Sequence, residues 1–268
     1  MIRPLLTLAA VVLAAAVSAS EDSLPYTKHH FSAGIAFTGV EPEVSAARHG
    51  GDGVAVDFGS LGVEEDDLNY FLEYRWRFSP KWALILATSK FDGTGVSSVR
   101  ESFEFDDITF DAGADVRGTL EVDVYLADVL YRVHRTERSE FMIGGGVHAL
   151  DMAASLQARA FVNADEATLD RAKATLLAPV PNLRFSYLYA TPHWGVTMIG
   201  GWLSANVDDY SGDFFYGHLR GHYRFADNWA ASLGYQYTDV DVERSRNQGN
   251  VRFDMVIKGP TLTVSWGF

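Results

Sequence analysis

Histidine and serine are the residues of this chain that could support nucleophilic catalysis, because none of its 268 residues is a cysteine. A serine hydrolase needs a histidine as the base for its nucleophile, and two residues at alternate positions of a strand share one face. His30 and Ser32 have this spacing, and they alternate with Phe31, Ala33 and Ile35. A single pair of this kind is weak support for catalysis. We therefore expect no enzymatic activity.

Histidines could also bind a metal ion. His29 and His30 are adjacent, and His218, Arg220 and His222 occupy alternate positions. A metal site needs three or four ligands in a tight geometry, and no spacing in this sequence fixes the remaining ligands. We expect no metal and no cofactor, and we expect the histidines to be polar interior residues with carboxylate partners.

A larger set of ionisable residues alternates with apolar residues. In segment 214–225, for example, Phe215, Leu219 and Tyr223 alternate with His218 and Arg220. A period of two places the two sets on opposite faces of a β-strand. The residues that we expect on the polar, inward faces are Glu73, Arg75, Arg77, Glu121, Asp123, His148, Arg184, His218, Arg220, His222, Arg224, Arg252 and Asp254.

The connections between the alternating segments indicate how the strands are arranged. Short connections alternate with long ones, which is typical of transmembrane barrels with short periplasmic turns and longer outer loops. We therefore predict an all-β, closed, antiparallel up-and-down barrel of ten strands. Eight or twelve strands remain alternatives, because segments 54–58 and 103–110 alternate weakly and could extend strands above the membrane. The predicted strands are 31–40, 67–78, 82–91, 118–133, 140–155, 183–191, 194–206, 213–225, 229–241 and 251–268.

A barrel of about ten strands has a narrow lumen, so we expect the inward charges to fill it as ion pairs. A thin or gated channel whose arginines and histidines favour anions is the alternative. Segment 164–177 mixes alanine and leucine with charged residues, and it could form a short helix that caps the mouth. Such a cap favours a plugged lumen over an open pore.

The first residues have the pattern of a secretory signal peptide. Arg3 precedes an apolar run from Leu5 to Val17, and Ala19 ends a stretch of small residues that suits cleavage. We expect residues 1–19 to be removed and 20–268 to form the barrel. No later apolar run is long enough for a membrane-spanning helix, and without a cysteine there is no lipoprotein anchor. These features predict export.

Aromatic residues cluster beside the short connections. An amphipathic ring is stable at the level of the lipid headgroups, so we interpret the cluster as an interfacial girdle. Its members are Trp76, Phe78, Trp82, Trp194, Phe225 and Trp229.

The last residues of the chain carry the clearest pattern. Leu262, Val264, Trp266 and the terminal Phe268 alternate with small or polar residues. This ending resembles the C-terminal strand by which the outer-membrane assembly machinery recognises its substrates. Along its mature length the chain is similar to the small outer-membrane β-barrel proteins of proteobacteria, a class that includes the OmpA transmembrane domain and OmpW. The resemblance implies the outer membrane of a Gram-negative cell, with the assembly machinery and periplasmic chaperones as partners. It implies no particular activity.

The final strand also contains a change of pattern. Apolar residues occupy odd positions in 251–257 and even positions in 262–268. The change falls at Gly259 and Pro260, and proline has no backbone donor for the sheet. We therefore predict a bulge or bend at this dipeptide.

Composition limits the possible functions. The net charge of -13 and the lack of a basic run exclude nucleic acid as a partner. We expect contact with outer-membrane lipid and lipopolysaccharide, and the oligomeric state stays open. The expected function is a structural or narrow, porin-like barrel with a charged lumen that is largely filled by side chains. The alternatives are a barrel that binds ligands or surfaces through its extracellular loops and, more distantly, a lipid-modifying enzyme.

Overall fold

The computed structural model describes residues 27–48, 56–59, 67–98, 102–105, 108–111, 113–162, 165–207, 210–246 and 249–268. The predicted signal peptide, residues 1–19, lies outside these ranges. Within them, no helix has the length and hydrophobicity needed to cross a membrane.

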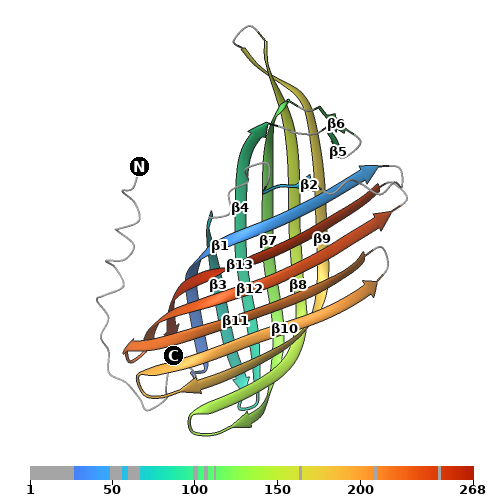
Figure 1. Ribbon diagram of the computed structural model, residues 1–268. Helices are drawn as coiled ribbons and strands as arrows, with labels where there is room; N and C mark the ends of the chain where they lie inside the picture. The colour runs from blue at the N-terminus through green and yellow to red at the C-terminus, as the bar shows by residue number, and fades with distance from the viewer. Residues whose placement is uncertain are drawn as a thin grey trace.

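Ten long antiparallel strands form one closed barrel (Figure 1). Each strand pairs with the next one along the chain. The last strand closes the barrel by pairing with the first, from His30 opposite Gly267 to Arg48 opposite Gly249. The predicted ten-stranded barrel is confirmed, and the alternatives of eight and twelve strands are wrong. The barrel strands are β1 (His29–Arg48), β3 (Asp67–Ser79), β4 (Trp82–Ser98), β7 (Asp115–Arg135), β8 (Ser139–Val162), β9 (Asp165–Ala190), β10 (Trp194–Val207), β11 (Tyr210–Ala226), β12 (Trp229–Arg246) and β13 (Gly249–Gly267).

Three short strands lie at the end of the barrel opposite the short turns (Figure 1). β2 (Val56–Asp57) pairs with the upper part of β1, and β5 (Phe103–Phe105) and β6 (Ile108–Phe110) form a separate hairpin. Segments 54–58 and 103–110 therefore add no strand that crosses the membrane. Their aromatic side chains Phe58, Phe105 and Phe110 are buried in an apolar cluster with residues of the barrel wall.

The predicted capping helix at 164–177 is wrong, because β9 begins at Asp165 and continues through this segment. Towards its end, Ala172, Ala174 and Leu176 follow a period of two, and Ala174 and Leu176 are buried. Ala174 pairs with Ala154 of β8, and Leu176 pairs with Met152. A period of two places these residues on one face of a strand but not on one face of a helix, so the segment forms a hairpin with β8.

The lower part of the barrel has an apolar outer surface. Exposed aromatic side chains occur at two heights on the barrel. Trp76, Trp194 and Phe225 lie beside the short turns, and Trp202 and Phe215 lie higher up. About 33 Å of strand separates Phe215 from Phe225 at ~3.3 Å per residue. A tilt of ~45° reduces this to about 23 Å, close to the apolar band of ~25 Å on known barrels. We call this part the membrane band, and the part above it the upper barrel.

The polarity of the two faces reverses in the upper barrel, as β13 shows. Within the band, Leu262 and Val264 face outward and Thr263 faces inward; above it, Phe253 and Met255 are buried inside the barrel. The register between β12 and β13 is unbroken through Gly259 and Pro260, so the predicted bulge is wrong. On the other side, the pairing with β1 is interrupted at these two residues without a change of register. The odd-numbered residues of β13 face inward along the whole strand. They are apolar in the upper barrel and small or polar in the membrane band.

This reversal corrects two of the predicted interior residues. Arg252 and Asp254 flank the buried Phe253, so both face the outside of the upper barrel. We expected a polar interior at every height, as the membrane band requires. Above the band the outer surface meets water, and the apolar residues of β13 turn to the interior as they do in a soluble β-protein.

Candidate functional site

Asp128 on β7 lies at the centre of a polar network that crosses the lumen. Its side chain is fully buried, and Arg184 Nη1 on β9 donates to its Oδ2 at 3.1 Å. Asn182 Nδ2, on the same strand as Arg184, donates to Oδ1 at 3.3 Å, and His148 Nε2 on β8 lies 3.6 Å from Oδ2. Burial of a carboxylate is costly unless donors replace its water. Arg184 and Asn182 supply such donors, and His148 lies close by.

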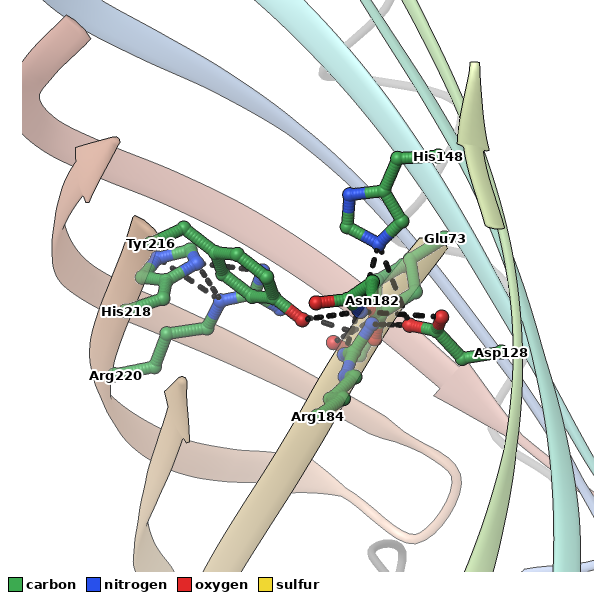
Figure 2. A network of polar contacts seen from close by, with 10 residues as sticks. Glu73, Asp128, His148, Asn182, Arg184, Tyr216, His218 and Arg220 are labelled. Atoms are coloured by element: carbon green, nitrogen blue, oxygen red, sulfur yellow. Dashed lines mark hydrogen bonds and ion pairs between the residues drawn. The ribbon is translucent and has the colours of Figure 1, made fainter. Parts of the chain in front are cut away.

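Glu73 on β3 extends this network to the other wall of the barrel. Its carboxylate lies 3.5 Å from Arg184 Nη2 and 4.0 Å from Arg220 Nη1 on β11. Arg220 Nη2 donates to His218 Nδ1 at 2.9 Å, and the Arg220 guanidinium lies 5.3 Å from the centre of the Phe71 ring. Asn182 Nδ2 also donates to the Tyr216 hydroxyl at 3.2 Å. We call the residues labelled in Figure 2 the lumen network: Glu73, Asp128, His148, Asn182, Arg184, Tyr216, His218 and Arg220.

A second ion pair lies closer to the short turns. Arg77 donates to both carboxylate oxygens of Glu140, at 2.6 and 3.0 Å, and Arg132 Nη1 lies 3.7 Å from the same group. Glu140 is buried. The parallel bonds of an arginine fork to a carboxylate fix both side chains, so this pair joins β3 to β8 across the lumen.

The glycines of β8 make room for this network. A Cβ added at Gly146 would collide with the carbonyl of Ala127 and crowd the carboxylate of Asp128, and a Cβ at Gly144 would collide with the carbonyl of Val129. The run from Gly144 to Gly146 therefore lets β8 approach β7 closely beside the most buried charge of the network.

An apolar chamber of about 180 Å³ lies inside the barrel next to the lumen network. Phe71, Phe91, Leu150, Phe214 and Met255 are among the side chains of its wall. His148 and Tyr216 line it as well, so the network supplies part of its polar lining, together with residues such as Asn69, Gln236 and Thr238. A smaller cavity of about 70 Å³ lies within the charged part of the lumen and is lined by arginines, histidines and Glu73.

The structure places most of the predicted polar-face residues inside the barrel. Five of them belong to the lumen network: Glu73, His148, Arg184, His218 and Arg220. Those on the inner face are Glu73, Arg75, Arg77, His148, Arg184, His218, Arg220, His222 and Arg224.

Glu121 and Asp123 do not line the lumen, and the prediction for them is wrong. They alternate with Leu120 and Val122, which are buried inside the barrel, and Lys90 on the neighbouring strand lies 3.9 Å from Asp123 on the outer surface. Like Arg252 and Asp254, they belong to the upper barrel, where charged residues face water.

The histidine partners also differ from expectation, because hydroxyl groups outnumber carboxylates. His222 contacts Ser232 Oγ and Thr197 Oγ1, both at 2.7 Å, and His218 Nε2 lies 3.0 Å from Thr261 Oγ1. In the described part of the chain, no group of three His, Asp or Glu is arranged to hold a metal ion.

The centre of the network is formed by residues outside the predicted polar-face set: Asp128, Asn182 and Tyr216. Asp128 was a detectable candidate, because it alternates with Val129 and Tyr131, which are typical outward residues of the band. Asn182 lies one residue outside the predicted strand 183–191, and Tyr216 carries an aromatic ring that the alternation does not assign to either face. No local signal in the sequence indicates that these three residues meet.

The chemistry available to this arrangement is limited. Asp128 and His148 form an acid-base pair, but the neighbour of His148 Nε2 is the amide of Asn182 at 3.1 Å, which is not a nucleophile. Ser32 faces the lumen, and its Oγ pairs with Ser265 Oγ at 3.1 Å. The lumen network is therefore better suited to separate the two ends of the lumen than to carry out catalysis.

Comparison with known proteins identifies the fold. No protein-family model matches the chain, and no curated protein sequence matches it. The outer membrane protease OmpT from Escherichia coli is similar in structure, with a TM-score of 0.57 and 9% identity over 94% of this chain and 99% of that chain. OprG from Pseudomonas aeruginosa gives a TM-score of 0.32 at 13% identity, covering 90% and 99% of the two chains. Ail, the attachment invasion locus protein of Yersinia pestis, gives 0.29 at 10% identity, covering 88% and 98%. The chain has the fold of the outer-membrane β-barrel proteins.

Proposed function

We propose that this chain is a non-conducting outer-membrane β-barrel whose role is structural: the membrane band anchors the upper barrel at the cell surface. The observation that carries the proposal is the burial of the side chains that fill the lumen. Asp128, His148 and Arg184 are between 0% and 3% exposed, and Phe58 and Phe253 in the upper barrel are 0% exposed. Ions cross a barrel through water, and these side chains leave little room for it.

Two layers of different chemistry support a closed lumen. The lumen network joins β3, β7, β8, β9 and β11 through ion pairs, and the apolar cluster above it includes aromatic residues from β5 and β6. A hydrated ion that entered from the cell surface would first lose its water in the apolar layer. The proposal assigns no catalysis to the chain. It includes contact of the membrane band with outer-membrane lipid and lipopolysaccharide.

Recording in planar lipid bilayers tests this proposal. The purified chain is first folded into vesicles, and heat-modifiable migration on SDS gels establishes that the barrel is intact. We then expect no stable current steps from the wild-type protein. Stable steps from intact barrels would contradict the proposal.

A narrow anion pore is the second candidate, because the charged part of the lumen holds more arginines than carboxylates. The cavity of about 70 Å³ is lined by Arg75, Arg184 and Arg220, with Glu73 as the carboxylate among its lining residues. Under this candidate the wild-type protein gives anion-selective steps, and the double substitution of Arg220→Ala and Arg224→Ala removes them. The same recording therefore separates the two candidates.

A further inference from the structure

We propose that the apolar chamber is a binding site for a small molecule with one aromatic ring and one hydrogen-bonding group, such as a phenol. The proposal goes beyond a structural role, and it rests on three features of the chamber: its size, the chemistry of its wall and one unsatisfied polar atom.

The size of the chamber fits one ring. Its volume is about 180 Å³, and an apolar protein cavity of ~150 Å³ stays dry and binds benzene. The chamber is therefore too small for a long acyl chain or a fused ring system. It is large enough for a single ring with one or two substituents.

The wall of the chamber favours an aromatic ring. Phe71, Phe91 and Phe214 are aromatic residues of its lining, and Met152 and Met255 are lining residues with a polarizable sulfur. Aromatic pairs and contacts between sulfur and aromatic rings are favourable beyond the area that they bury. A saturated ligand of the same size would lack these contacts.

One side chain that lines the chamber carries a polar atom without a partner. His148 is 2% exposed, its Nε2 faces Asn182 and Asp128, and its Nδ1 makes no hydrogen bond. In Figure 2 the dashed contacts of this ring start from Nε2, and its other nitrogen carries none. A buried nitrogen without a partner is costly, so a ligand hydroxyl that pairs with it gains affinity.

The aromatic rings around His148 fix this nitrogen in place. The Phe214 ring lies edge-on to the imidazole at 5.2 Å between ring centres, and the Tyr216 ring lies 5.5 Å away. Both rings also line the chamber. A single ring bound here would complete an aromatic cluster that surrounds the polar group.

The methionines of the chain allow a direct test. The full chain is folded in detergent micelles with 13C-labelled methionine methyl groups, and phenol is added while NMR spectra are recorded. Met152 and Met255 line the chamber, Met142 belongs to a separate cluster near the short turns, and Met198 faces outward in the membrane band. We expect saturable shifts of Met152 and Met255, with Met142 unchanged. Shifts confined to Met198 and linear in phenol would show partitioning into the micelle and would overturn the proposal.

Two valines on one strand supply a matched pair of variants. Val240 and Val242 lie on the inner face of β12 and are 3% and 4% exposed, and Val240 lines the chamber whereas Val242 does not. We expect Val240→Phe to abolish the saturable shifts and Val242→Phe to keep them. Heat-modifiable migration shows that each variant is folded. Equal binding by both folded variants would place phenol elsewhere.

The polar part of the proposal has its own measurement. Phenol should bind the wild-type chamber about tenfold more tightly than benzene, as one additional hydrogen bond to a buried nitrogen predicts. This comparison needs no variant. Equal affinities for the two compounds would remove the hydrogen-bonding group from the proposed ligand class. Because these experiments record occupancy of the chamber, their result is separate from whether the barrel conducts ions.

Discussion

The membrane band and the upper barrel are built from the same strands, but their faces have opposite polarity. On β13, Thr261 and Thr263 face inward and Leu262 outward in the band, whereas Phe253 faces inward and Arg252 outward in the upper barrel. The backbone pairing is continuous between these levels. The difference shows that the surroundings of the outer surface, lipid or water, decide which face is apolar.

The two regions also differ in where their ion pairs lie. In the band, Arg77 is 10% exposed and its partner Glu140 is buried, whereas in the upper barrel the similar pair of Arg252 and Asp241 lies on the outer surface. Both are bidentate, with shortest distances of 2.6 Å. The same bidentate contact between arginine and carboxylate can therefore be compared in the lumen and on the outer surface.

The largest expected effect concerns the end of β13, which closes the band. Deletion of Phe268, or its replacement by a charged residue, should leave precursor processing intact and block insertion, with degradation in the periplasm. The terminal backbone pairs with β1, and on the outer surface the Phe268 ring stacks on Phe31 and packs at a tilt against Trp266. Fractionation of cells and immunoblotting measure this.

A change in the upper barrel supplies the control for this deletion. Arg252→Ala lies on the same strand but on its water-facing surface, and it should insert as the wild type does. Normal insertion of the Phe268 deletion would show that the terminal residue carries no assembly signal.

The two arginine pairs give the next largest difference. Arg77→Ala leaves Glu140 buried without its bidentate partner, and it should lower the free energy of unfolding by about 3–5 kcal/mol. Arg252→Ala removes an exposed pair and should cost less than about 1 kcal/mol. Unfolding in urea, followed by tryptophan fluorescence in vesicles, measures both. Equal losses would mean that the lumen is as hydrated as the outer surface.

A smaller effect tests the outer surface alone. Leu219 and Asp213 both face outward on β11, the first in the membrane band and the second above it. Leu219→Arg should cost about 2–4 kcal/mol, because a charge then faces lipid. Asp213→Arg should change stability by no more than about 0.5 kcal/mol. The same urea measurement applies, and a comparable cost at Asp213 would extend the membrane band upward.

Much of the fold could be predicted because it rests on local patterns. The period of two around Leu219 and Tyr223 defines a strand, and the short connections fix antiparallel neighbours. The upper ends of the strands were underestimated, as at segment 164–177, because small and charged residues weaken the alternation there. The two short segments with Phe58 and Phe105 could be recognised as weakly alternating, but not as elements that fill the upper barrel.

The sequence by itself therefore determined the antiparallel barrel, the order of its strands, the outward face within the band and the apolar C-terminal strand, whereas the structure chose ten strands over eight or twelve. Only an apolar outer face is stable against lipid, so the alternation of apolar and polar residues is enough to identify the outward face within the membrane band. Only the tertiary structure decided where this polarity reverses, and therefore which way Glu121 and Arg252 point. It also decided that Asp128, Asn182 and Tyr216 meet, because contacts across a lumen depend on the closure of the whole barrel, and no spacing along one strand encodes them.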